Sequence, residues 1–266
     1  MSSQRTPVVF IPGLWIHSSS WQPWTELFQD AGYEPIAAGW PGQAATVEET
    51  RRNAQNLANI SFGAIVDHYA RLIDRLDTKP IVIGHSFGGA VTEKLLGMDK
   101  AAAAVAIDAA QIKGVMPLPL PMLRSAFPGL KNPANNKRAV SLTRDQFRYG
   151  FGNAVSSPES DALHEQWSIP GPAKPLFEAA VMNFLPNSPL KVDTRNDSRG
   201  PLLLIMGGKD HTVPPAISKA TFKQYRHSNA LTELHEFPDR GHSLTLDHGW
   251  REIAEFSLKW LQEHGH

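Results

Sequence analysis

The chain has 266 residues, in which 26 basic side chains balance 26 acidic ones, and it contains no cysteine. This length suits one large α/β domain with room for an insertion, and the balanced charge gives no sign of a nucleic-acid partner. The lack of cysteine excludes disulfides, thiolate catalysis and cysteine-ligated metals.

The termini and the hydropathy give an expectation about location. The N-terminal stretch MSSQRTPVVF has too short an apolar run for a secretory signal. No apolar run in the sequence approaches the roughly 20 residues that a membrane-spanning helix needs. We therefore expect a cytoplasmic protein that acts on a small molecule, with no membrane or nucleic-acid partner; the sequence does not indicate an oligomeric state.

Strands and helices alternate over the first 110 residues. Short β-rich runs predict strands, and apolar residues at helical spacing predict helices. The alanine-rich run at 101–108 would favour a helix by itself, but its place after a helix favours a strand. The expected strands are 6–13, 33–42, 79–84 and 101–108, and the expected helices are 20–33, 62–76 and 87–97. This alternation predicts a mostly parallel sheet with helices on its faces.

The alternation stops at residue 111 and resumes near residue 200. The intervening segment is rich in proline, asparagine and serine, and two pieces within it, 157–167 and 175–184, have helical patterns. We interpret 111–195 as an insertion with its own small elements. After it, the pattern predicts strands at 200–210 and 230–238 and helices at 214–226 and 249–265.

A serine lies between the third expected strand and the helix that follows it. The segment Gly84-His85-Ser86-Phe87-Gly88 fits the pattern G-x-S-x-G. The three fixed letters occur by chance in about one chain in ten of this size. Here an apolar run precedes them and a helical pattern follows, as a nucleophile elbow requires. Glycine is needed two residues before and after the serine because side chains there would collide.

A serine hydroxyl needs a base, and the base needs a carboxylate that orients it. Downstream, Asp210 follows a strand and His242 lies in a loop after the last strand, in the order serine, acid, histidine. Asp108 also ends a strand and remains an alternative acid. Asp210 is favoured because two glycines turn the chain before it and two prolines begin the next helix.

The same reaction needs donors for an oxyanion. We expect one from the backbone N–H of Phe87, which follows the serine, and the other from the loop after the first strand. In that loop, Gly13 lets the backbone turn inward, and the N–H of Leu14, with that of Trp15 as an alternative, is the expected donor. Each donor acts through its backbone, so the identity of its side chain is incidental.

The sequence gives no support for a metal or a cofactor. No two histidines have the spacing H-E-x-x-H, and neither the phosphate-binding nor the dinucleotide-binding glycine motif occurs. We therefore expect no metal site and no cofactor. His85, beside the serine, is interpreted as a packing residue.

Taken together, five segments resemble the α/β-hydrolase superfamily, and in particular its carboxylesterase-like serine hydrolases. In chain order they are FIPGLW, SSSW, GHSFGG, GGKDHTVP and DRGHS, and they span nearly the whole chain. The resemblance implies an α/β-hydrolase fold, with a mostly parallel central sheet, flanking helices and an inserted helical cap. On this view 1–110 and 196–266 form the core and 111–195 form the cap.

The resemblance also implies roles for individual residues. Ser86 would be the nucleophile, Asp210 the orienting acid and His242 the base. The superfamily often has His-Gly in its oxyanion loop, where this chain has Pro12-Gly13, so a backbone N–H and not a histidine is expected to act there.

These inferences predict an enzyme that hydrolyses a small, largely apolar carboxylic ester or lactone through an acyl-enzyme. Apolar side chains from the cap are expected to form the pocket wall, with Trp15, Trp167 and Phe184 as candidate substrate contacts. Two alternatives remain open: another serine-triad reaction, such as C–C bond hydrolysis or perhydrolysis, and a ligand-binding receptor that retains the triad.

Overall fold

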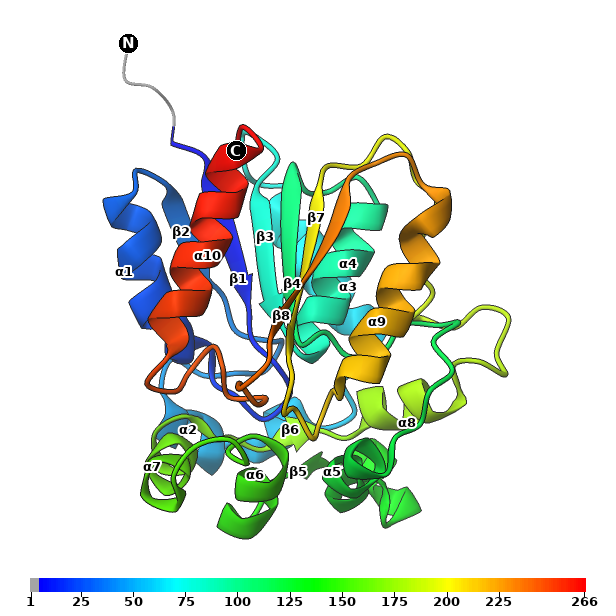
Figure 1. The fold of residues 1–266 in the computed structure, drawn as a ribbon. Coiled ribbons are helices and arrows are strands. Elements are labelled where there is room, and N and C mark those ends of the chain that lie inside the picture. Colours follow the sequence, from blue (N-terminus) through cyan, green and yellow to red (C-terminus); the bar gives the residue numbers. More distant parts are fainter. Residues whose placement is uncertain (1–4) are drawn as a thin grey trace.

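Six parallel strands form the central sheet of the protein, which a computed structural model describes over residues 5–266 (Figure 1). The first four residues of the N-terminal stretch considered above lie outside the described part. The strand order is β2-β1-β3-β4-β7-β8. The bounds are β1 Pro7–Ile11, β2 Glu34–Ala37, β3 Ile81–His85, β4 Ala103–Ile107, β7 Leu202–Gly207 and β8 Thr232–Phe237. The predicted parallel sheet is confirmed.

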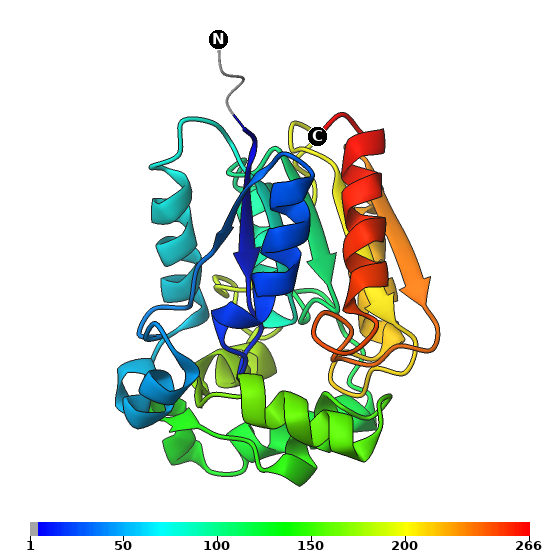
Figure 2. The same ribbon diagram turned by 90° about the vertical axis from the view of Figure 1, so that its left-hand side faces the viewer.

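Helices cover both faces of the sheet (Figures 1 and 2). One layer contains α1 (Gln22–Asp30) and α10 (Trp250–Glu263), and the other contains α3 (Phe62–Ile73), α4 (Phe87–Gly97) and α9 (Pro215–Gln224). Alternate residues of a strand point to opposite faces, so one strand supplies both layers. In β1, Val8 and Phe10 pack toward α1 and α10, whereas Val9 and Ile11 pack toward α3 and α4. This two-sided burial explains the continuous apolar runs of the inner strands β1, β3, β4 and β7.

The segment 111–195 supplies most of the elements below the carboxyl ends of the strands (Figure 1). Its helices are α5 Leu120–Leu130, α6 Arg144–Gly150, α7 Ser157–Trp167 and α8 Lys174–Val181, and its short strands are β5 Ala139–Val140 and β6 Gly171–Pro172. The two helical pieces expected there correspond to α7 and α8. The segment also contains a short 3-10 helix, Pro133–Lys137. Within the described residues, the core has three more: Ser18–Trp21, Ala54–Leu57 and Tyr225–His227.

Three helices do not follow from the sequence pattern. α5 lies in the proline-rich part of the insertion, with Pro121 in its first turn, where a missing N–H costs little, and Pro128 inside it. α6 begins at a capping box formed by Thr143 and Gln146. α2 (Val47–Arg52) is too short to show a period. Among residues 5–266, no helix combines the length and the apolar composition needed to cross a bilayer.

A carboxylic acid is buried inside the helix layer behind the sheet. Glu93, on α4, is fully buried, and its Oε2 accepts a 2.7 Å hydrogen bond from the hydroxyl of Tyr225. Among the described residues, the other oxygen, Oε1, has no hydrogen-bond partner. Burial raises the pKa of this carboxyl group from 4.5 to about 8, so it is protonated at neutral pH.

Glu93 is expected to make the fold less stable as the pH rises. The unfolded chain releases this proton near pH 4.5 and the folded chain near pH 8. Between these values the folded state binds the extra proton, so the free energy of unfolding falls with increasing pH, by an amount on the order of a few kcal/mol across the window. Glu93→Gln, which is neutral at every pH, should remove this slope.

The measurement is urea unfolding of both proteins at several pH values between about 5 and 9. We expect the variant to gain stability relative to the unsubstituted protein as the pH rises. Stability curves that stay parallel over the whole range would show that Glu93 ionises in the folded protein at its ordinary pH.

Candidate active site

Ser86 lies at a sharp turn between β3 and α4. Its backbone has φ 58° and ψ −123°, which is a strained conformation for a residue with a side chain. The flanking glycines allow the turn, because a Cβ at Gly84 would lie 2.2 Å from the carbonyl oxygen of Gly88. A Cβ at Gly88 would lie 2.3 Å from the carbonyl oxygen of Ile11. The G-x-S-x-G spacing is therefore a steric requirement of this turn.

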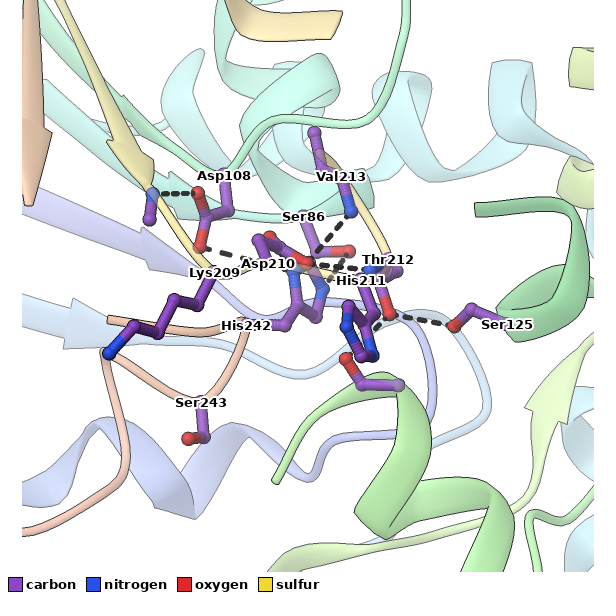
Figure 3. Close-up of polar contacts among 12 residues, drawn as sticks. Ser86, Asp108, Ser125, Lys209, Asp210, His211, Thr212, Val213, His242 and Ser243 are labelled. Carbon is purple, nitrogen blue, oxygen red and sulfur yellow. Dashed lines mark hydrogen bonds and ion pairs between the residues drawn. The ribbon is translucent and has the colours of Figure 1, made fainter. Parts of the chain in front are cut away.

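Ser86, His242 and Asp210 form a continuous hydrogen-bonded chain (Figure 3). His242 Nδ1 lies 2.6 Å from Asp210 Oδ2, and His242 Nε2 lies 3.0 Å from Ser86 Oγ. A carboxylate only accepts hydrogen bonds, so Nδ1 carries the proton and Nε2 presents a lone pair to the serine hydroxyl. The structure thus brings together the three residues that the sequence predicted for this chain of contacts. In this geometry His242 can remove the proton of Ser86.

The turn after β7 holds Asp210 in place. Its Oδ1 accepts the backbone N–H groups of Thr212 at 2.6 Å and Val213 at 2.9 Å, which leaves Oδ2 for the imidazole. Gly208 lets the turn pass close to the next loop, since a Cβ there would lie 2.4 Å from the carbonyl oxygen of Pro238. The two N–H donors fix the orientation of the Asp210 side chain.

Asp108, the alternative acid, lies near the imidazole but does not bond to it. The distance from its Oδ2 to His242 Nδ1 is 4.0 Å, against 2.6 Å for Asp210. Its Oδ1 instead accepts the backbone N–H of Gly207 at 2.7 Å. Burial, and then the charge of Asp210, raise the pKa of the Asp108 carboxyl well above its usual range. The geometry therefore favours Asp210 as the residue that orients His242.

The expected oxyanion donors lie beside the serine. Phe87 is the first residue of α4, so its N–H has no acceptor within the helix. Within residues 5–266, the N–H of Leu14 donates to no other group. The loop of Leu14 approaches closely because Gly13 has no side chain, and a Cβ there would lie 2.9 Å from the Cβ of Ser86. Both residues line the cavity that contains Ser86.

That cavity has a volume of about 190 Å³ and a mostly apolar wall. The insertion and α9 supply most of this wall, and the side chains that contribute are Leu118, Met122, Leu123, Ala126, Leu130, Leu176, Ala179, Ala180 and Ile217. The polar side chains are Ser86, Gln111, Ser125 and Thr212. An apolar wall from 111–195 was expected, but the helix α5 that supplies much of it was not; the apolar positions 118, 122, 126 and 130, four residues apart, are the signal that could have indicated this helix.

Of the three expected substrate contacts, only Trp15 lines the cavity. Trp167 is partly buried against the main core and is not part of the cavity wall. Phe184 follows α8, is 85% exposed and does not line the cavity either. The structure therefore does not place Trp167 or Phe184 at the site, because Trp167 packs against the core and Phe184 is exposed to solvent.

Two aromatic rings pack against His242. The ring centroid of His85 lies 4.5 Å away and that of Phe151 lies 4.7 Å away. Burial, and then the nearby His242, lower the pKa of the His85 imidazole well below its usual range, so this ring is neutral.

His85, Asp108 and His242 each offer one ligand atom within a 4.8 Å cluster. A metal there would have to displace Asp210 or Ser86 from His242, so these residues do not suit one.

Comparison with solved structures supports this fold. A monoacylglycerol lipase from Paleococcus ferrophilus has a TM-score of 0.67 to this chain, covers 97% of it and 95% of its own length, and is 22% identical. A methylesterase from Arabidopsis has a TM-score of 0.66, with coverage of 97% and 99% and an identity of 17%. At these identities the likeness concerns the fold alone.

Sequence comparison gives the family. A curated Escherichia coli (strain K12) protein named "Putative carboxymethylenebutenolidase" is 29% identical over 91 residues, which are 30% of this chain and 32% of that protein. The chain thus matches about a third of the length of this relative. A family model described as "Alpha/beta hydrolase family" matches residues 8–256. Because this match covers nearly the whole chain, the protein belongs to the alpha/beta hydrolase family.

Proposed function

We propose that the protein is a serine hydrolase that cleaves a small, largely apolar carboxylic ester or lactone through an acyl-enzyme. The observation that carries this proposal is the bonded chain Ser86–His242–Asp210, which ends at an apolar cavity. Names of similar proteins agree with ester chemistry, since they include a methylesterase and a monoacylglycerol lipase.

The proposed reaction begins when Ser86 Oγ attacks the carbonyl carbon of the ester and His242 Nε2 takes the hydroxyl proton. The carbonyl oxygen becomes an oxyanion, which the N–H groups of Leu14 and Phe87 stabilise. His242 then gives the proton to the departing alcohol, and the acyl group stays on Ser86. A water molecule, deprotonated by His242, attacks this acyl group; the bond to Ser86 Oγ then breaks, His242 returns the proton to Oγ, and the acid leaves. Asp210 stabilises the imidazolium that forms in both halves.

We further propose that residues 111–195 act as the cap of this core. Side chains from α5 and α8 form the wall opposite Ser86, so the cap determines which substrates fit. The cavity volume of about 190 Å³ has room for roughly six groups of the size of a water molecule. This volume favours short acyl or alcohol moieties.

A series of p-nitrophenyl esters with acyl chains of increasing length tests this substrate class. We expect kcat/KM to be highest for short chains such as butyrate, and to fall by roughly tenfold or more for dodecanoate, because a long chain overfills the cavity. A β-diketone substrate serves as the comparison for C–C bond hydrolysis. Equal or greater turnover of the diketone would contradict the ester assignment.

Shortening one side chain of the cavity wall should shift the preferred chain length. Met122 lies on α5 and lines the cavity, so Met122→Ala is expected to raise kcat/KM for octanoate relative to butyrate severalfold. Met116 is 70% exposed and does not line the cavity, so Met116→Ala is the matched control and should leave this ratio unchanged. If both variants have the same ratio as the unsubstituted enzyme, the cavity does not hold the acyl chain.

A further inference from the structure

A second carboxyl group lies beside the triad and has no part in the mechanism above. Asp108 directly follows β4 and is fully buried. Its backbone has φ 41°, a conformation that residues with a side chain rarely adopt and that is often found at functional sites. Its N–H donates to the carbonyl of Ile205 on β7 at 2.8 Å, and its carboxyl lies between β7 and His242 (Figure 3).

The two oxygens of Asp108 have different surroundings. Oδ1 accepts the N–H of Gly207, the last residue of β7, at 2.7 Å. Oδ2 lies 4.0 Å from His242 Nδ1, beyond hydrogen-bonding distance, and among the described residues it has no donor. An ionised oxygen buried without a donor is costly, so this atom needs a proton or a new partner.

Asp210 has more hydrogen-bond donors around its carboxyl group than Asp108 has. It accepts two backbone N–H groups and the N–H of His242, three donors in all. Two neighbouring carboxyl groups that are both buried do not both ionise at small cost, so one of them keeps its proton. Asp108, with a single donor, is that group.

The other titratable groups near Asp108 do not change this conclusion. Burial keeps the ring of His85 neutral. Asp247 forms an ion pair with Arg240 and accepts the hydroxyl of Ser243, so its charge is compensated locally. The remaining effect of the Asp247 charge further favours the protonated form of Asp108. His242 itself donates its proton to Asp210.

We propose that Asp108 is a positioning residue, a neutral carboxylic acid that accepts the Gly207 N–H through Oδ1 and donates its own proton from Oδ2 to the carboxylate of Asp210. Through these two bonds, Asp108 links Gly207, where the turn begins, to the carboxylate of Asp210, where the turn ends. They hold Asp210 in line with the imidazole. The inference rests on the proposed function, because it assigns Asp210 to the base His242.

Two substitutions separate positioning from charge. Asp108→Asn keeps an acceptor for Gly207 and a donor for Asp210, and asparagine tolerates a positive φ. Asp108→Gly removes the carboxyl and also tolerates this backbone. We expect kcat to stay within about threefold for asparagine and to fall about 10- to 100-fold for glycine, the usual effect of losing a hydrogen bond to a charged group. KM should change little in either variant, because Asp108 does not line the cavity.

The pH profile tests the protonation state of Asp108. If it is neutral, Asp108→Asn replaces one neutral group by another, and the acid limb of kcat/KM stays in place. If it is ionised, the substitution removes a negative charge 4.0 Å from the imidazole, and the acid limb moves to lower pH by about one unit or more. Such a shift would overturn the proposal, and so would wild-type kcat in Asp108→Gly.

Proton NMR of the resting protein supplies a readout that needs no substrate and no glycine variant. The Nδ1 proton shared by His242 and Asp210 should give a low-field resonance that Asp108→Asn preserves. Loss of this resonance in a folded Asp108→Asn protein would contradict the proposal. Fluorophosphonate labelling of Ser86 in the unsubstituted protein reports separately on the proposed function, so failure of one idea is distinct from failure of the other.

Discussion

Replacing Ser86 by alanine is expected to lower kcat for ester hydrolysis by a factor on the order of 10⁶. Ser86 supplies the atom that attacks the carbonyl carbon, and alanine lacks the hydroxyl that lies 3.0 Å from His242 Nε2. The N–H donors and the cavity remain, so a small residual rate over water is expected. The measurement is the initial rate of hydrolysis of p-nitrophenyl butyrate at saturating concentration.

Ser125 offers a matched control for this substitution. It lines the same cavity, but its hydroxyl bonds to Thr212 Oγ1 at 2.7 Å and not to a base. Ser125→Ala should therefore change kcat by less than about tenfold, the size of a lost neutral hydrogen bond. Circular dichroism establishes that both variants fold. Wild-type turnover by a folded Ser86→Ala protein would show that Ser86 is not the nucleophile.

The second large effect is expected at the acid. Asp210→Asn should lower kcat by about 10⁴, because an amide no longer fixes the tautomer of His242 or stabilises its imidazolium. The substitution keeps the shape of the side chain and an oxygen for the N–H groups of Thr212 and Val213. A loss of activity then reflects chemistry at the imidazole and not a broken turn.

Asp108→Asn is the comparison for Asp210→Asn. Asp108 lies 4.0 Å from the imidazole, and asparagine keeps an acceptor and a donor there, so we expect kcat to stay within about threefold. Both variants are assayed at saturating ester, after circular dichroism has shown that they fold. An active Asp210→Asn enzyme together with a crippled Asp108→Asn enzyme would place the acid at the end of β4.

The sequence indicated the core of the site because the relevant signals are local. Ser86 is flanked by the two glycines that its turn requires, and the apolar run of β3 and the helix α4 enclose the motif. Because Asp210, His242 and Asp108 each follow a predicted strand, the sequence placed them at the same edge of the sheet. The choice between the two acids required distances, since both follow parallel strands and both lie near the imidazole.

The insertion was less predictable for a physical reason. Its helices are short and begin at prolines or caps, and their apolar residues divide between the cavity, the core and the surface. Trp167 and Phe184 are large aromatic residues of the kind that line pockets, but one ends α7 and the other follows α8, and the direction of a side chain there depends on its neighbours in space. Met122 and Leu176 line the cavity because α5 and α8 pack together over Ser86.

Covalent labelling reports directly on Ser86 as a nucleophile. The protein is treated with a fluorophosphonate, digested and analysed by peptide mass spectrometry, alongside Ser86→Ala and Ser125→Ala. We expect one label per chain on Ser86, loss of esterase activity in proportion to labelling, no label at this peptide in Ser86→Ala, and normal labelling in Ser125→Ala. Esterase activity that survives complete labelling of Ser86, or inactivation through a label on another residue, would contradict the proposed mechanism.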